Sequence, residues 1–480
     1  MIHAAPARAT AAERDDGGSR VTVAAIAIAA VGLMAIAAML LASGSKSGAV
    51  LALALAGAPV LLYLAIRRPF IFPFGLYAVL VPFNHIIVIS GLGTLTKFAG
   101  ILASVALLLA VVRTKRVVRP PGVLFAWLAF VTWACASIAW ALNPNDSLTL
   151  IGTLLQLFFL FAVTAIAPIS SAELRVVMAM IVLGGAAAAA YGGNLFLSGA
   201  QTYGNRLFLK SGSGGEFLDP NHFAAALLLP LALALVWAFK APKPFGKLVS
   251  FAALAALLVG VYASGSRGAL VAAGFIALFV AWRTGYWLQS IIIAALGGVL
   301  SLAVKTSVWS RFLADVGTGS GRSSIWMIGA HAFMGSPVIG AGVGNFPDAY
   351  DQSLLHQYTP IFAYWDRAAH NLILMVGVEL GVIGLALLLW VMAGQARLLR
   401  GIGRGHELYD VRIGLEAALV GLLVASMFLD TLYWKYAWLT FTALVLARSA
   451  SIAPSEEPVS WSTPAAMRAD EIRRRAVMRS

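Results

Sequence analysis

The feature that most constrains this chain is a long series of apolar segments, each long enough to cross a bilayer. A helix that spans the hydrocarbon layer needs about 20 mostly apolar residues. Such runs recur along most of the sequence, and about 14 of them meet this length. They are 21–42, 48–66, 70–90, 95–112, 122–141, 148–168, 175–198, 221–239, 248–264, 267–282, 287–304, 369–393, 412–431 and 432–448. The sequence therefore predicts an all-α fold, a polytopic membrane bundle of about 12–14 transmembrane helices.

The composition excludes an ordinary soluble protein. Only 11% of the residues are charged and 60% are hydrophobic, whereas soluble domains carry about 25% charged residues. The formal net charge is +14. In a soluble chain such an excess would indicate a nucleic-acid partner, but in an apolar chain it indicates positive charges sorted by membrane side. We therefore expect the lipid bilayer and no nucleic acid as partner. The single cysteine, Cys135, excludes a disulfide framework.

The positive charges also give an orientation. With the N-terminus in the cytoplasm, 24 of the 34 lysines and arginines fall at inner span ends and 10 at outer ends. Because positive residues gather on the cytoplasmic side, both termini of this multi-pass protein are expected to be cytoplasmic.

The polar stretches divide the chain further. Residues 1–20 are small and polar and are expected to be a disordered cytoplasmic N-terminus. Residues 21–69 hold two accessory spans, and residues 448–480 form a basic cytoplasmic tail expected to touch anionic lipid. Residues 305–368 are the longest polar-containing stretch between spans, and the orientation places them outside. Because long loops in compact proteins are usually functional, functional residues are expected in this stretch.

Two arginines in the outer segments are candidates for binding an anion. Arg267 lies between two apolar runs, and an arginine at membrane depth costs a few kcal/mol unless it has a partner. The alternative is an arginine that reaches the headgroups. Arg322 and Trp326 are four residues apart and share a face of a helix. The alternative interpretation of these two residues is an amphipathic helix at the membrane surface, whose tryptophan lies at the membrane–water interface.

One histidine is a candidate for proton transfer. His370 lies where the apolar run 371–393 begins, and an imidazole can act as a base near neutral pH. The alternative is a structural histidine. Glu379 is nine residues further along and lies on roughly the opposite face of the helix from His370. We expect it to be an internal partner of another helix. The histidines show no spacing typical of a metal site, so no metal is predicted. Because the planar guanidinium suits phosphate, the arginines favour a lipid-linked diphosphate as substrate.

These residues lie in motifs that resemble the O-antigen ligase and O-antigen polymerase superfamily. The resemblance covers roughly residues 70–447, as an O-antigen ligase-like membrane domain that contains the large periplasmic loop 305–368. Its motifs are S-G-S-R-G (264–268), G-R-S-S-I-W (321–326), S-P-V-I-G-A-G-V-G-N-F (336–346), A-H-N-L (369–372) and E-L-G-V-I-G (379–384), with D-P-N-H-F-A-A-A-L (219–227) and L-T-K-F-A-G (95–100) in the more variable N-terminal part.

The resemblance implies a function. Members transfer a glycan from undecaprenyl diphosphate to an acceptor on the periplasmic face of the bacterial inner membrane. It implies catalytic roles for Arg267, Arg322 and His370, without metal or cofactor and with inversion at the anomeric carbon. Further residues are candidates for substrate binding, either through the same resemblance or because they are polar or aromatic and lie near these motifs in the sequence. They are Lys97, Arg206, Lys210, Asn221, Trp326 and Asn371.

Several functions stay open at this point. The favoured acceptor is lipid A-core, as in an O-antigen ligase; a polymerase would use a second glycan on its carrier, and a protein oligosaccharyltransferase would use Ser or Thr. Alternatives of another class are a lipid-linked sugar transporter and a membrane scaffold acting through residues 449–480. A transporter would be expected to show repeated halves with broken helices, and no matching half is visible in the sequence.

Overall fold

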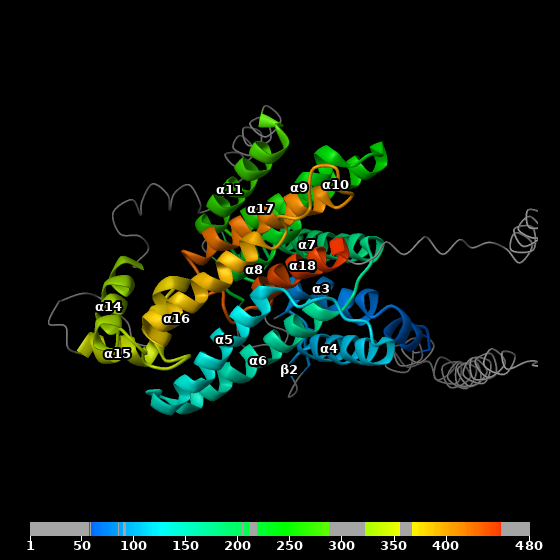
Figure 1. The fold of residues 1–480 in the computed structure, drawn as a ribbon. Coiled ribbons are helices and arrows are strands. Elements are labelled where there is room, and N and C mark those ends of the chain that lie inside the picture. Colours follow the sequence, from blue (N-terminus) through cyan, green and yellow to red (C-terminus); the bar gives the residue numbers. More distant parts are fainter. Residues whose placement is uncertain are drawn as a thin grey trace, which may run out of the picture.

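The computed structural model describes residues 57, 59–84, 86–89, 93–200, 202–203, 206–210, 218–287, 322–355 and 367–452 (Figure 1). The expected spans 21–42 and 287–304 and the first part of 48–66 lie outside these residues. The same holds for the N-terminal segment 1–20 and for the tail beyond residue 452.

The described part of the chain is built of helices, which confirms the all-α polytopic fold. Among the described residues, eight helices are long and apolar enough to cross a membrane. They are α4 (Leu95–Thr114), α5 with η3 (Gly122–Trp140), α6 (Pro144–Ile166), α7 (Ser171–Leu197), α8 (Pro220–Ala226) continued by α9 (Leu228–Lys240), α10 (Pro244–Ala263), α11 (Arg267–Thr284) and α16 (Leu372–Arg397). Each coincides with an expected span. The protein is therefore a multi-pass membrane protein.

The expected span 70–90 is shorter and broken in the structure. Residues 70–83 form three short pieces, η1 (Phe70–Phe74), α3 (Gly75–Leu80) and η2 (Val81–Phe83). The helix Pro59–Arg67 meets this group at a bend of 106°. Pro73 and Pro82 each lack the N–H that a continuous helix requires, which explains why the apolar run does not become one helix.

The last two expected spans are helices with shifted bounds. They form α17 (Tyr409–Ser426) and α18 (Lys435–Ile452). Between them lies a non-helical connector, residues 427–434, where the sequence predicted that the two spans adjoin. This connector is important for the candidate site.

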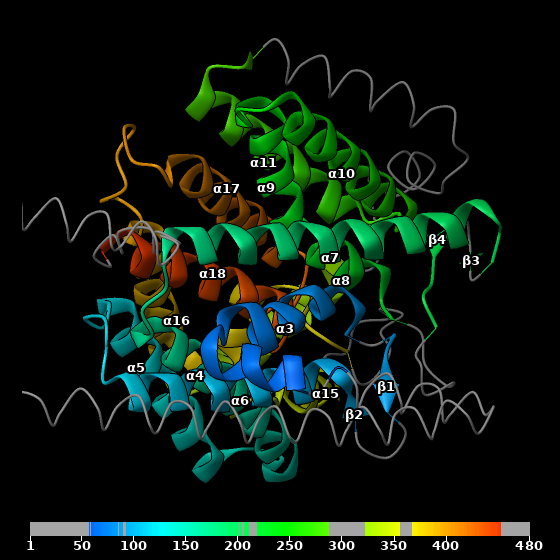
Figure 2. The same cartoon turned by 90° about the vertical axis from the view of Figure 1, so that its right-hand side faces the viewer.

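Two groups of helices pack around long central helices (Figures 1 and 2). Helices α9, α10, α11 and α17 pack together on one side, and α4, α5 and α6 on the other. Helix α18 contacts both groups through α17 and α6, and α7 packs on α9, α10, α3 and α18. In the most apolar 18-residue stretch of the span Pro220–Lys240, 89% of the residues are buried inside the protein. A helix surrounded in this way must be apolar on all faces, and the sequence of α9, LLPLALALVWAFK, has this character.

The remaining elements lie in the connecting segments. Strand β1 (Val88–Ile89) pairs with β2 (Gly93–Thr94), and β3 (Thr202–Tyr203) pairs with β4 (Arg206–Leu207), both antiparallel. In the described part of loop 305–368, α14 (Arg322–Gly335) and α15 (Phe346–Leu355) pack on each other and on α16 (Figure 1).

Helix α16 is broken at Gly381, and the glycine-rich segment 336–346 fills the break. Gly381 has a φ of +67°, a left-handed conformation that favours glycine. The freed backbone groups pair with the segment: the Ala341 N–H donates to Val378 O at 2.8 Å, and the Val382 N–H donates to Pro337 O at 2.8 Å. Non-helical backbone inside a membrane bundle requires such internal partners. The segment 336–346 therefore has a structural role at this position.

Candidate functional site

The connector, residues 427–434, lies where the segments that carry the candidate residues meet. Together with Lys435, which follows it, the connector contacts most of these segments. The Asn371 side chain donates from Nδ2 to Met427 O at 3.2 Å. Phe428 packs against Gly268, next to Arg267, so closely that a side-chain carbon on Gly268 would lie 3.2 Å from it. Segments far apart in sequence therefore meet where the chain passes from α17 to α18.

His370 lies in this region in a strained backbone conformation. Its φ is +48°, a region that residues other than glycine rarely adopt and that is often found at functional sites. Its backbone N–H donates a hydrogen bond to the carboxylate of Asp430, which helps to hold this conformation. Its Nδ1 atom is buried and has no hydrogen-bond partner among the described residues. The imidazole therefore has one buried polar atom that no described residue satisfies.

Asp430 is the electrostatic centre of the site. Burial raises the pKa of its carboxyl group, the charges of His370 and Arg322 lower it, and the charge of Asp219 raises it. Its Oδ1 atom is buried and, within the described part of the chain, accepts no hydrogen bond. The charges of His370, Arg322 and Asp219 therefore lie close enough to this carboxyl group to affect its pKa.

Arg322 begins α14, and Trp326 lies one turn further along the same helix. This confirms that the two residues share a helix. The Trp326 indole donates from Nε1 to the carbonyl of Ala369 at 3.1 Å. Because Ala369 directly precedes His370, this hydrogen bond fixes α14 and its arginine next to the histidine.

Arg267 is the first residue of α11, after Ser266, whose hydroxyl caps the helix by accepting from Ala269 N at 3.3 Å. The turn before it is held by Arg206, which donates from Nε to Ser264 O at 3.0 Å. Arg206 also donates from Nη2 to Asn221 Oδ1 at 3.3 Å.

Asn221 extends this network to Asp219, since its backbone N–H and its Nδ2 both donate to Asp219 Oδ1 at 2.8 Å. Asp219 is one of the charges that face Asp430. Arg206 and Asn221 thus join the turn before Arg267 to the carboxylate pair Asp219 and Asp430.

Two lysines from opposite ends of the sequence lie together beside the connector. Lys435 donates from Nζ to Asn84 Oδ1 at 2.5 Å and to the hydroxyls of Thr94 and Thr96 at 2.9 Å each. Lys97 is exposed in the first turn of α4, and its charge acts on Lys435. A small cavity lies between Lys435, Trp434 and His222. The structure therefore brings Lys97 to the same region as the connector.

The other candidates have different surroundings. Asn371 caps α16, since its Oδ1 accepts from Leu374 N at 3.0 Å, so both ends of its amide are bonded within the protein and its substrate-binding role stays a prediction. Lys210 is exposed three residues after β4 and also stays a prediction. Glu379 is buried, and its Oε2 accepts from the Tyr433 hydroxyl at 2.7 Å. Glu379 thus has an internal partner, but this partner lies in the connector and not on another helix as expected.

A comparison with protein families decides how this geometry is interpreted. Residues 251–389 match the family model described as O-antigen ligase. The resemblance to the O-antigen ligase superfamily is confirmed. The match contains Arg267, Arg322 and His370. It supports an enzyme of the O-antigen ligase or polymerase type, which transfers a lipid-linked glycan at a membrane. A comparison with curated proteins found no match.

The O-antigen ligase match ends before the connector, and sequence reasoning also missed it. Asp430, Tyr433 and Lys435 were not candidates, because the two last apolar runs appeared continuous. One signal was present: Asp430 is a charged residue between apolar runs in F-L-D-T-L-Y-W (428–434), the same argument that selected Arg267. A charge in such a position generally has a functional role.

Proposed function

We propose that this protein transfers a glycan from undecaprenyl diphosphate to an acceptor hydroxyl at the periplasmic face of the inner membrane, with lipid A-core as the acceptor. The observation that carries the proposal is that His370 and Arg322 both lie near Asp430. The Nδ1 atom of His370 and the Oδ1 atom of Asp430 are buried and accept or donate no hydrogen bond among the described residues. Buried polar atoms normally have partners, so two orphan atoms in adjacent side chains favour a polar substrate there.

The arginines act on the leaving group. Arg267 and Arg322 hold the diphosphate and stabilise the negative charge that develops as the bond from the anomeric carbon to the phosphate oxygen breaks. Preorganised donors of this kind are often the largest contribution to catalysis. The diphosphate is already an activated leaving group, so the proposal needs no metal and no cofactor.

His370 acts on the acceptor. It orients the acceptor hydroxyl and receives its proton while the oxygen forms the new bond to the anomeric carbon from the opposite face, which inverts the carbon. Asp430 holds the His370 backbone and places a negative charge beside the imidazole, which stabilises the imidazolium that forms. The aromatic and polar loop 322–355, fixed to Ala369 through Trp326, would limit the access of water to the donor.

Lys97, Arg206, Lys210, Asn221, Trp326 and Asn371 are proposed to contact the glycan or the diphosphate. Arg206 and Asn221 also fix the turn that positions Arg267, so their replacement tests positioning together with binding.

A genetic experiment tests this proposal. The gene is deleted and lipopolysaccharide is separated on a gel. If the protein is a ligase, lipid A-core in the deletion strain lacks long glycan chains, and the glycan polymer remains on undecaprenyl diphosphate. Core that carries a single repeat would instead assign a polymerase, and unchanged lipopolysaccharide with loss of secreted polymer would assign exopolysaccharide synthesis. Complementation with Arg267→Ala should fail. The scaffold alternative predicts the opposite: Arg267→Ala would complement the deletion, and a chain lacking residues 449–480 would not.

A further inference from the structure

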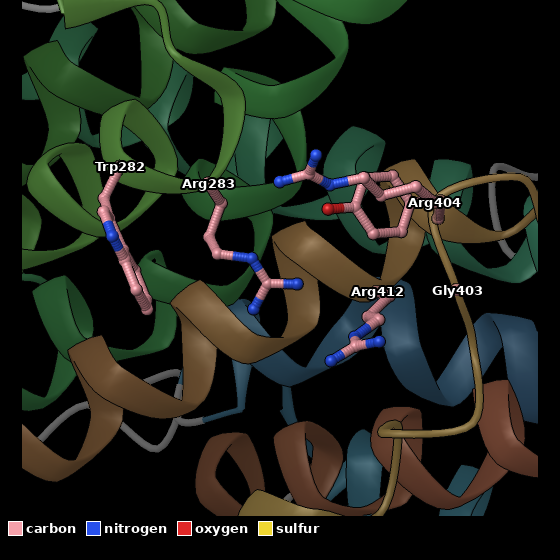
Figure 3. A pocket seen from close by; sticks show the side chains of 6 residues that line it. Trp282, Arg283, Gly403, Arg404 and Arg412 are labelled. Carbon is pink, nitrogen blue, oxygen red and sulfur yellow. The ribbon is translucent and has the colours of Figure 1, made fainter.

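A second polar site lies at the end of α11 remote from the candidate active site. A cavity of about 450 Å³ is lined by Trp282, Arg283, Gly403, Arg404, Tyr409 and Arg412 (Figure 3). Arg267 and Arg283 lie at opposite ends of α11. With a rise of 1.5 Å per residue, about 24 Å of helix separates them. The cavity is therefore a separate site, and in the proposed orientation it faces the cytoplasm.

The cavity has an excess of positive charge. One carboxylate, Glu416, pairs with both Arg283 at 2.5 Å and Arg412 at 2.8 Å. Arg404 forms no salt bridge with any described residue, and its guanidinium and that of Arg283 lie against the Tyr409 hydroxyl. Lys240 lies 5.6 Å from the centre of the Tyr409 ring. Three arginines therefore line the cavity, and one carboxylate, Glu416, pairs with two of them.

The geometry of the cavity is fixed by the protein. Arg412 donates from Nη1 to Ile402 O at 2.5 Å, which holds the loop that carries Gly403 and Arg404 against α17. The side chains of Arg283, Arg404 and Arg412 come from different segments and line the same cavity (Figure 3). Arginines arranged in this way offer paired N–H donors to phosphate oxygens.

An apolar ridge leads from the bilayer to this cavity. Val271, Phe275, Leu278 and Trp282 are exposed, with exposed fractions of 38%, 48%, 56% and 64%. Their spacing places them on one face of α11. The ridge ends at Trp282, which lines the cavity beside Arg283, and a tryptophan at such a position is typical of the membrane–water interface. A ligand with acyl chains and a charged headgroup fits both surfaces.

We infer that this cavity binds the phosphate of an anionic phospholipid headgroup, with the acyl chains along the exposed face of α11. Basic pockets between membrane helices on the cytoplasmic side bind lipid headgroups of this kind. A free phosphate anion shares the headgroup chemistry but would make no use of the ridge. The inference does not depend on the proposed transfer reaction.

The experiment measures lipid binding by the purified full chain. The chain is placed in nanodiscs of phosphatidylcholine that contain a small fraction of phosphatidylglycerol, and bound phosphatidylglycerol is counted by native mass spectrometry after release. Arg404→Gln removes one cavity charge at an exposed side chain that makes no salt bridge with a described residue. Trp282→Ala shortens the ridge at an exposed position. Arg397→Gln is the matched control, because Arg397 is an exposed arginine at the end of α16 that does not line the cavity.

We expect Arg404→Gln to weaken phosphatidylglycerol binding by about tenfold, as for loss of one charge-assisted contact, and Trp282→Ala to weaken it by a smaller factor. Arg397→Gln should bind as the wild type does. Equal binding by wild type and Arg404→Gln would overturn the inference. Competition by inorganic phosphate at concentrations similar to those of phosphatidylglycerol would also overturn it, because the site would then bind a free anion. Because binding is measured without transfer, failure here is distinct from failure of the proposed function.

Discussion

Two non-helical segments of this protein contact α16 and differ in how their polar groups are bonded. In the glycine-rich segment 336–346, Asn345 donates from Nδ2 to Ser147 Oγ at 2.8 Å, and Val343 O accepts from Ser147 Oγ at 2.7 Å. Around the connector, by contrast, Nδ1 of His370 and Oδ1 of Asp430 are buried without a partner among the described residues. The polar groups of the first segment are bonded within the protein, whereas the proposed function assigns the unbonded atoms around the connector to substrate binding.

The same contrast appears in two buried carboxylates. Glu379 accepts from the Tyr433 hydroxyl and from the backbone N–H groups of Gly344 and Phe346. Asp430 accepts from one backbone N–H, that of His370, and faces charged residues on several segments. Burial alone therefore does not distinguish the two carboxylates, whereas the number of protein donors around each does.

The largest expected effect comes from filling the break in α16. A side-chain carbon on Gly381 would lie 2.2 Å from Val338 O, and φ there is +67°, so Gly381→Ala has to move the segment 336–346. We expect it to destabilise the protein by about 3 kcal/mol or more, measured by thermal unfolding in detergent. Gly152→Ala, at an exposed position in α6 with no atom within 4 Å, is the control and should be neutral. Equal stability of the two variants would show that the segment is loosely held.

The next effect concerns His370. Replacement by Asn removes the imidazole while keeping a residue that tolerates the left-handed conformation. We expect His370→Asn to lower the transfer rate by about 100-fold or more, as for loss of a general base, with little change in the melting temperature. The measurement is the rate of glycan transfer to lipid A-core by purified protein. An unchanged rate would remove His370 from the mechanism.

The smallest expected effect is the pH dependence of stability at Asp430. Because burial raises the pKa of this carboxyl group, ionisation opposes folding, and the stability present below the ordinary aspartate pKa of about 3.9 is lost as the pH rises. Asp430→Asn removes the ionisation. We expect the variant to gain stability relative to the wild type as the pH is raised from 4 to 7, measured by thermal unfolding. A gain on lowering the pH would mean that a protein cation stabilises the carboxylate in the folded state.

The sequence predicted the parts of the fold that depend on local composition. Apolar length predicted the eight spanning helices, and the spacing of Arg322 and Trp326 predicted a shared helix. The break at Gly381 was not predictable from E-L-G-V-I-G, because it depends on hydrogen bonds from residues about 40 positions earlier. For the site, charge at the membrane boundary selected Arg267, and the A-H-N-L motif selected His370. Asp430 and Lys435 were missed because the non-helical connector interrupts what the sequence shows as continuous apolar chain.

The central claim is that the groups gathered at the connector, and not the well-bonded carboxylate nearby, perform the transfer. The most direct test compares Asp430→Asn with Glu379→Gln in purified full-length protein in nanodiscs, with an undecaprenyl-diphosphate-linked glycan and lipid A-core. Both changes remove one buried negative charge and keep the size of the side chain. We predict that Asp430→Asn lowers the initial transfer rate by about tenfold or more, and that Glu379→Gln leaves the rate per folded molecule within about threefold. A larger loss in Glu379→Gln than in Asp430→Asn would contradict the account.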